Sequence, residues 1–148
     1  MTGADRDKLL AFMRQELYAV QASVSVRDAP QAATVGIVVS DRFEVFFDTL
    51  TSSRKAVNLR HKSAAAVVIG PATAGAERTV QLEGAADEPT GMELERLLTL
   101  YFARFPDGRE RQQWPGITYW RVSPTWLRYS DFSIDPPEII EFTTSDLV

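Results

Sequence analysis

The sequence predicts a mainly β protein with flanking helices, in which six or seven short antiparallel strands close into a barrel. Two observations support this fold class. Apolar residues recur with a period of two in several short runs, which is typical of half-buried strands. Most connections between these runs are only a few residues long, too short for the crossovers that parallel strands need, so neighbouring strands are expected to run antiparallel.

The composition is typical of a globular protein, with 45% hydrophobic and 24% charged residues, and we expect one domain over residues 1–148. The net charge of −4 argues against a nucleic-acid-binding role, which depends on a basic surface. The sequence has no cysteine and a single histidine, so no metal site is expected. Residues 1–8 include no long apolar stretch, and neither a signal peptide nor a membrane-spanning helix is predicted. We therefore expect a cytoplasmic protein without membrane partners.

The first half of the chain is predicted to contain two helices and three strands. An apolar stripe with helical spacing runs from near Ala4 to Leu17. From Tyr18 the period changes to two, because valines and an alanine alternate with polar residues as in a half-buried strand, which a turn over residues 28–31 ends. The other elements of this half are two strands over residues 32–40 and 43–48, joined by the tight connection Asp41-Arg42, and a short helix over residues 54–61.

The second half is predicted to add four strands over residues 64–69, 78–86, 117–122 and 126–129, a helix over residues 92–105 and a final apolar stretch over residues 139–142. The unbroken apolar run 64–69 is typical of a strand buried on both faces. Ser123-Pro124 separates the third and fourth of these strands. The polar run from Arg109 to Gln113 is interpreted as a solvated loop.

The junction between the strand 43–48 and the helix 54–61 has the residue types of an anion-binding site. Hydroxyl side chains precede the helix and two cations occupy its first turn: Thr49, Ser52, Ser53, Arg54 and Lys55. Unpaired N–H groups at a helix N-terminus favour an anion, and a guanidinium can donate two hydrogen bonds to a phosphate. Cations in a first turn oppose the helix dipole by roughly a few tenths of a kcal/mol, which a bound phosphate would offset. Alternatively, Ser53 only caps the helix and both cations are solvated.

The order of these elements resembles the FMN-binding split barrels similar to pyridoxamine 5′-phosphate oxidase. The resemblance covers most of the chain and is carried by the opening helix, the strand 19–24, Phe46-Phe47-Asp48-Thr49, Ser53-Arg54-Lys55-Ala56-Val57-Asn58-Leu59, the strand 80–86, the helix 92–105 and the closing segment 121–129. It implies a six- to seven-stranded antiparallel split β-barrel of the FMN-binding type. It also implies a homodimer with FMN at each of two sites between subunits, the phosphate lying against Thr49, Ser52, Ser53, Arg54 and Lys55.

The resemblance assigns further residues to the cofactor. Gln81 is placed near the isoalloxazine ring, because a carboxamide both donates and accepts hydrogen bonds, and a solvated strand glutamine is the alternative. Trp126 lies in the closing strand pair that resembles the family's cofactor edge, whereas strand tryptophans commonly belong to a core or an interface. The strand 34–39 is expected beneath the ring. His61 is interpreted as a solvated residue, and no catalytic residue is assigned.

The function that the resemblance implies is that of an FMN-dependent oxidoreductase acting on an unidentified small molecule. Oxidation of pyridoxamine 5′-phosphate itself is not expected, because the authentic oxidases continue into an Arg-Leu-His-Asp-Arg motif and this sequence has no histidine after His61. Two other classes stay open. One is a binding module for a deazaflavin, haem or another anionic planar ligand, and the other is a dimeric barrel without a ligand.

Overall fold

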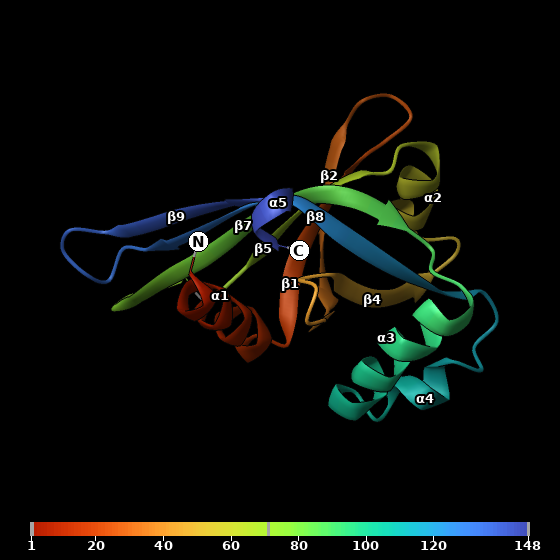
Figure 1. The fold of residues 1–148 in the computed structure, drawn as a ribbon. Helices are drawn as coiled ribbons and strands as arrows, with labels where there is room; N and C mark the ends of the chain where they lie inside the picture. The colour runs from red at the N-terminus through yellow and green to blue at the C-terminus, as the bar shows by residue number, and fades with distance from the viewer. Residues whose placement is uncertain (1, 71, 148) are drawn as a thin grey trace.

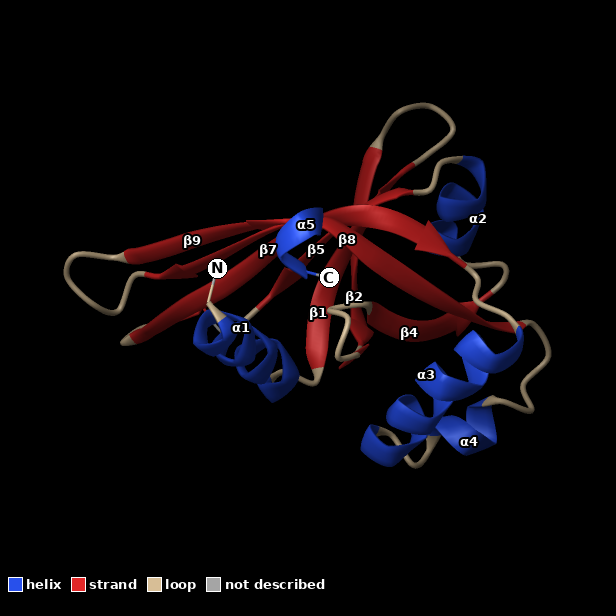
Figure 2. Ribbon diagram, in the orientation of Figure 1, coloured by secondary structure: helices blue, strands red, loops and turns tan. Residues whose placement is uncertain are grey.

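The computed structural model describes residues 2–70 and 72–147, in which an antiparallel sheet is flanked by helices (Figure 1, Figure 2). The strands are β1 (Tyr18–Val24), β2 (Pro30–Gly36), β3 (Val38–Val39), β4 (Val45–Leu50), β5 (Ala64–Ile69), β6 (Ala72–Thr73), β7 (Ala76–Asp87), β8 (Ile117–Asp131) and β9 (Glu138–Thr143). The helices are α1 (Gly3–Gln15), α2 (Arg54–His61), α3 (Gly91–Arg104), α4 (Gly108–Arg111) and α5 (Thr144–Leu147). The bounds predicted for α2 and β5 coincide with those observed.

The sheet curls because the two ends of its strand order are neighbours in the sequence. The order is β2-β1-β5-β7-β8-β4-β3, with β6 paired to β7 and β9 paired to β8, and every pairing is antiparallel. Only Ile37 separates β2 from β3, so the chain itself holds the two ends of this order together. Beyond the curled part, β7, β8 and β9 extend as a ribbon (Figure 1). The predicted antiparallel split barrel is confirmed, although the predicted strand 32–40 is divided at Ile37 into β2 and β3.

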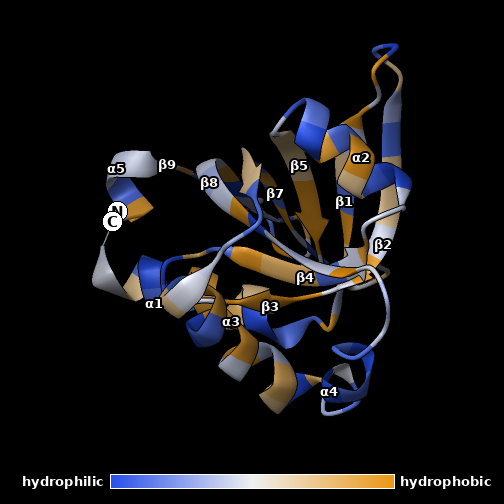
Figure 3. Ribbon diagram, turned by 90° about the vertical axis from the view of Figure 1, so that its right-hand side faces the viewer, coloured by the Kyte–Doolittle hydropathy of each residue, from blue (hydrophilic) through white to orange (hydrophobic). Residues whose placement is uncertain are grey.

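Two groups of buried apolar side chains hold the longer helices to the sheet. The larger group fills the inside of the curled sheet and includes Leu9, Phe12 and Met13 of α1. The smaller group lies between α3 and β4, where the rings of Phe46 and Tyr101 meet edge to face with centroids 5.7 Å apart. Figure 3 shows β3 and β4 as largely apolar strands with α3 beneath them. Burying a large apolar side chain contributes about 1.5–3 kcal/mol, so each group favours this packing.

β1 alternates between its two faces as predicted, but it buries its polar face. Gln21 and Ser23 are 2% and 3% exposed, whereas Val20 is 41% exposed. A half-buried strand ordinarily buries its apolar residues. Here the polar side chains face α2, where Asn58 donates a hydrogen bond to Ser23, and the apolar ones form the outer face of the sheet. The alternation itself therefore does not identify the buried side.

β5 was predicted to be buried on both faces, and this prediction is wrong for the described chain. Val67 is 1% exposed and points into the core, whereas Val68 is 46% exposed on the outer face. The register places Val68 between Val20 of β1 and Gln81 of β7. The outer face of β1 and β5 is therefore an apolar surface.

β8 is one continuous strand where two strands were predicted on either side of Ser123-Pro124. The pairing of β7 with β8 shifts register between Glu83 and Gly84, so that β8 has one more residue than β7 at this point. Such a bulge bends the ladder without ending it and accommodates a proline, which lacks an N–H donor. A Cβ atom at Gly84 would lie 2.3 Å from the carbonyl oxygen of Ser123, so this position requires glycine.

Candidate functional site

The turn before α2 and the first turn of this helix bring four of the predicted site residues together. Ser53 is the N-cap of α2, and its Oγ accepts a hydrogen bond from the N–H of Ala56 at 3.3 Å. Thr49 Oγ1 donates to Ser53 Oγ at 3.0 Å, and Lys55 Nζ donates to Thr49 Oγ1 at 3.4 Å. Ser52 is exposed in the same turn. The structure therefore brings the hydroxyl groups and the ammonium group to one place.

Arg54 and Lys55 line a hollow of about 260 Å³ whose other lining residues come from β1 and β2: Gln21, Ser23, Gln31, Ala32 and Ala33. We call it the anion hollow. The first turn of α2 carries no acidic residue, and neither cation forms an ion pair with a carboxylate among the described residues. The two positive charges are therefore available to a ligand.

Polar side chains in and behind the lining of the anion hollow had not been assigned to a site by the sequence analysis. Asn58 of α2 is 4% exposed, and its Nδ2 donates to Ser23 Oγ at 3.0 Å and to Gln31 Oε1 at 2.8 Å. Gln21 Oε1 is buried and has no hydrogen-bond partner within the described part of the chain. Buried polar atoms are ordinarily paired, so an unpaired acceptor in the wall of a hollow suits a ligand that donates to it.

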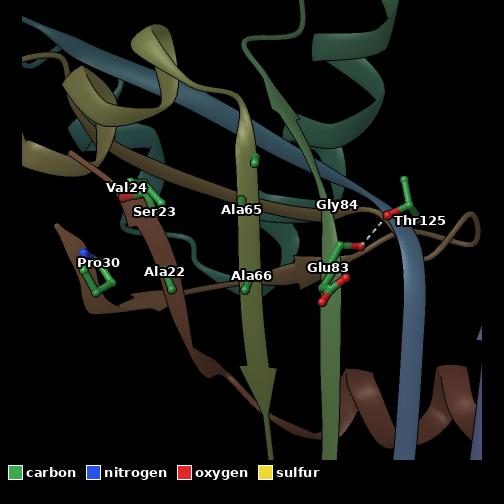
Figure 4. Close-up of a pocket in the computed structure, with 10 residues that line it drawn as sticks. Ala22, Ser23, Val24, Pro30, Ala65, Ala66, Glu83, Gly84 and Thr125 are labelled. Atoms are coloured by element: carbon green, nitrogen blue, oxygen red, sulfur yellow. Dashed lines mark hydrogen bonds between the residues drawn. The ribbon is translucent and has the colours of Figure 1, made fainter. Parts of the chain in front are cut away.

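A second hollow of about 400 Å³ opens on the outer face of the sheet (Figure 4) and is lined by Ala22, Ser23, Val24, Pro30, Ala64, Ala65, Ala66, Glu83, Gly84 and Thr125. We call it the apolar hollow, because most of these side chains are small and apolar. Thr125 Oγ1 donates to the carbonyl oxygen of Glu83 at 3.2 Å beside the bulge. Ser23 lines both hollows, which lie on the two sides of the end of β1.

Most of the strand 34–39, which was expected beneath a flat ring, is buried in this chain. Val38 and Val39 are 5% and 4% exposed, whereas Thr34 at its start is exposed. Ala32 and Ala33, just before the predicted stretch 34–39, line the anion hollow instead.

Gln81 and Trp126 lie apart from the anion hollow, on the outer face of β7 and β8. Gln81 is exposed and pairs in register with Val68. Trp126 is half-buried, its ring lies 5.4 Å from the guanidinium carbon of Arg128, and it pairs in register with Glu83, which lines the apolar hollow. Within one chain, these two predicted residues therefore do not join the cluster at α2.

A guanidinium at the other end of α2 holds the turn that precedes this helix. Arg60 Nη1 donates to the carbonyl oxygen of Thr51 at 3.2 Å, and its Nε and Nη2 donate to Glu88 at 2.9 Å and 3.0 Å. The hydrogen bonds from Arg60 hold the pKa of Glu88 below its ordinary value of 4.5. His61, the next residue, is exposed at the end of the helix.

Arg111 shows that the segment 109–113 is not simply a solvated loop. The segment begins within the short helix α4, and Arg111 Nε donates to Asp48 Oδ2 at 2.9 Å. Its Nη2 donates to the hydroxyl of Tyr101 at 3.2 Å, and burial raises the pKa of that hydroxyl. Asp48 directly precedes Thr49, so this ion pair fastens the end of β4 beside the turn.

The fold is shared with solved structures, although no family model and no curated protein sequence matches this chain. A haem-binding protein from Mycobacterium smegmatis superposes with a TM-score of 0.81 at 16% identity over 99% of this chain, which spans 60% of that protein. A putative pyridoxamine 5′-phosphate oxidase from Listeria innocua gives 0.67 at 18% identity, with 84% and 96% of the two chains covered. A pyridoxamine 5′-phosphate oxidase-related, FMN-binding protein from Nostoc punctiforme gives 0.65 at 15% identity, with 94% and 85% covered.

The chain has the pyridoxamine 5′-phosphate oxidase-like split-barrel fold. The resemblance inferred from the sequence is thereby confirmed at the level of the fold. Split barrels of this kind include proteins described as binding FMN and proteins described as binding haem, so the fold is compatible with ligand binding and does not choose the ligand.

Two further properties concern metal binding and membrane insertion. No group of three or more His, Cys, Asp or Glu side chains among residues 2–70 and 72–147 could hold a metal ion. In the same part of the chain, every helix is too short or too polar to cross a lipid bilayer.

Proposed function

We propose that this split barrel binds FMN and acts as a flavin-dependent oxidoreductase on a small molecule. The observation that carries the proposal is that the two hollows share Ser23 and lie next to each other at the end of β1. One hollow offers cations without carboxylate partners, and the other offers a surface of small apolar side chains. A ligand with a phosphate at one end and a flat, largely apolar ring system at the other suits both.

The donor set at α2 suits the phosphate of FMN. Arg54 can donate two hydrogen bonds and Lys55 supplies a compact positive charge, while Ser53 and the N-terminus of α2 add further donors. Gln21 supplies the buried acceptor for a hydroxyl or N–H of the ligand. A bound flavin would supply the electron chemistry, and these residues would bind and orient it.

The uncovered face of β1 and β5 supports a symmetric homodimer. Tyr18, Val20 and Val68 are 60%, 41% and 46% exposed. Contiguous apolar surface usually marks an interface, and a two-fold contact is the commonest way to bury it. Gln81 lies beside Val68 and Trp126 lies one strand further on, so a second copy on this face would cover both residues and bring them to a shared site.

Val68→Asp tests the dimer, because it places a charge at the centre of the proposed interface. Sedimentation at micromolar concentration should show a dimer for the wild type and a monomer for the variant. Met92→Asp, which adds the same charge at an 86% exposed apolar position of α3 outside this face, is the matched control and should stay dimeric. A wild-type monomer that still binds FMN tightly would remove the shared site from the proposal.

Haem is the alternative ligand, because a haem-binding protein has the same fold. Haem iron needs an axial side chain such as histidine, cysteine, methionine or tyrosine. Among the described residues, none of these types lines either hollow, and His61 is exposed at the end of α2. The residues present therefore fit FMN better than haem.

The visible absorption spectrum of freshly purified protein separates the ligand classes. A yellow protein is expected for bound flavin, whereas a strong Soret band would indicate haem and a spectrum without visible bands an empty barrel. A deazaflavin is identified by mass spectrometry of the released compound. Titration of the ligand-free protein should then show tighter binding of FMN than of riboflavin, and equal affinities would reject the role assigned to Arg54 and Lys55.

A further inference from the structure

Asn58 is placed to control the anion hollow without lining it. It lies in the middle of α2, is 4% exposed and is absent from the lining of the hollow. Its side chain nevertheless contacts two residues that do line the hollow, Ser23 of β1 and Gln31 of β2. The hydrogen bonds of Asn58 can therefore influence a ligand through these two side chains.

The direction of the two hydrogen bonds decides what the hollow presents to a ligand. Asn58 Nδ2 uses its two hydrogens, donating to Ser23 Oγ and to Gln31 Oε1. Because Ser23 Oγ accepts, its own proton must point elsewhere, and no described residue accepts it. Because Gln31 uses its oxygen, its Nε2 keeps two hydrogens, and these also have no acceptor among the described residues.

We propose that Asn58 is a positioning residue that sets Ser23 and Gln31 as hydrogen-bond donors toward the phosphate of the ligand. This inference rests on the proposed function and deepens it by naming what selects the anionic end. With Arg54 and Lys55, the hollow then presents four donating side chains. The oxygens of a phosphate dianion only accept, so the set is complementary to it. Gln21 Oε1, a buried acceptor without a partner among the described residues, suits a hydroxyl next to the phosphate ester.

The opposite orientation of the Asn58 carboxamide would reverse this chemistry. Its Oδ1 would accept from Ser23, which would use its one hydrogen there, and from Gln31, whose carboxamide would turn its oxygen, in place of its Nε2, toward the hollow. Asparagine permits either arrangement, whereas aspartate can only accept. Asn58→Asp therefore enforces the reversed arrangement at almost unchanged volume.

The test compares FMN and riboflavin affinities of the ligand-free protein by quenching of flavin fluorescence. Asn58→Asp should weaken FMN binding by about tenfold to hundredfold, the scale for losing hydrogen bonds to a charged group, and riboflavin binding by much less. Val57→Asp adds the same charge at the neighbouring, 50% exposed position and should change the ratio little. An unchanged ratio in a folded Asn58→Asp protein would overturn the proposal.

A double-mutant comparison separates positioning from the added charge. In a Ser23→Ala/Gln31→Ala background, Asn58→Asp has no donors left to redirect, so its effect on the FMN to riboflavin ratio should shrink to that of charge alone. An equally large effect in both backgrounds would show that Asn58 does not act through these residues.

A measurement on the wild-type protein does not depend on FMN or on the stability of a variant. The side-chain amide hydrogens of Asn58 should exchange slowly with solvent in nuclear magnetic resonance spectra, and the Gln31 amide signals should shift when inorganic phosphate is added. If FMN does not bind but phosphate shifts Gln31, the proposed cofactor is wrong and the role of Asn58 stands. Fast exchange at Asn58 with no response of Gln31 would reject that role.

Discussion

The basic residues in the first turn of α2 and those that join α3 to the sheet have opposite surroundings. Arg54 and Lys55 form no ion pair with a described carboxylate, although the chain carries a net charge of −4. Arg96 and Arg121 both contact Glu44, which is 5% exposed, and each also contacts a second carboxylate. Paired guanidiniums fasten α3 to the sheet, whereas unpaired cations at a hollow leave their charge for a ligand. The difference distinguishes residues that stabilise the fold from residues that are proposed to bind a ligand.

The largest effect on folding is expected from Glu44→Gln. The carboxylate of Glu44 accepts from Ser40 Oγ at 2.7 Å and from Arg96 and Arg121 at 3.0 Å each. Breaking a buried ion pair costs about 3–5 kcal/mol, and we expect the lower end because both arginines keep another carboxylate. Urea unfolding measures the loss. FMN affinity of the folded variant should be unchanged. A variant of normal stability that binds FMN poorly would show that Glu44 serves binding and not the stability of the fold.

The complementary change, Arg54→Ala or Lys55→Ala, should leave the free energy of unfolding nearly unchanged. Each should weaken FMN binding by about 1–3 kcal/mol, because each removes a charged donor to the phosphate. Titration of the ligand-free protein with FMN measures this. Lys62→Ala, which removes a cation from the other end of α2, is the control and should bind normally. Retained affinity in the Arg54→Ala/Lys55→Ala double variant would place the phosphate elsewhere.

The smallest effect concerns Arg60, which shares α2 with Arg54 but is paired with Glu88. The pKa of Glu88 is lowered in the folded state by the hydrogen bonds from Arg60, so the ionised carboxylate stabilises the fold above its ordinary pKa of 4.5. This stabilisation is lost as the pH falls through the lowered folded-state pKa. Because Glu88 is 37% exposed, the contribution is below about 1 kcal/mol. Melting temperatures of the wild type and Glu88→Gln should differ most near neutral pH and converge below pH 4.5; a constant difference would contradict this.

Local sequence was sufficient for the helix and turn at the site. The hydroxyls and the capping position Ser53 lie within one turn of α2, and the observed helix has the predicted bounds, Arg54–His61. Capping and helical periodicity depend on residues a few positions apart, and a single sequence contains them.

Burial and long-range pairing were less accessible to sequence reasoning. The period of two in β1 defined two faces, but Gln21 and Ser23 became buried because Asn58, on a separate helix, covers their side. The role of Arg111 depends on Asp48, which is distant in the sequence. β8 continues through Pro124 because its partner β7 has Gly84 at the shift in register. Each outcome depends on a contact between residues that are far apart in the sequence, which local patterns do not predict.

The two hollows also differ in how far apart their lining segments lie in the sequence, which affects how early each can form during folding. All the lining residues of the anion hollow, and Asn58 behind it, lie between Gln21 and Asn58. The apolar hollow additionally needs Glu83, Gly84 and Thr125, and the pairing of β4 with β8 joins Val45 to Val122 across more than half of the chain. Contacts between close segments form at lower entropic cost than distant ones. During synthesis, the segment from Gln21 to Asn58 leaves the ribosome well before β8. The anion hollow can therefore assemble before the barrel closes.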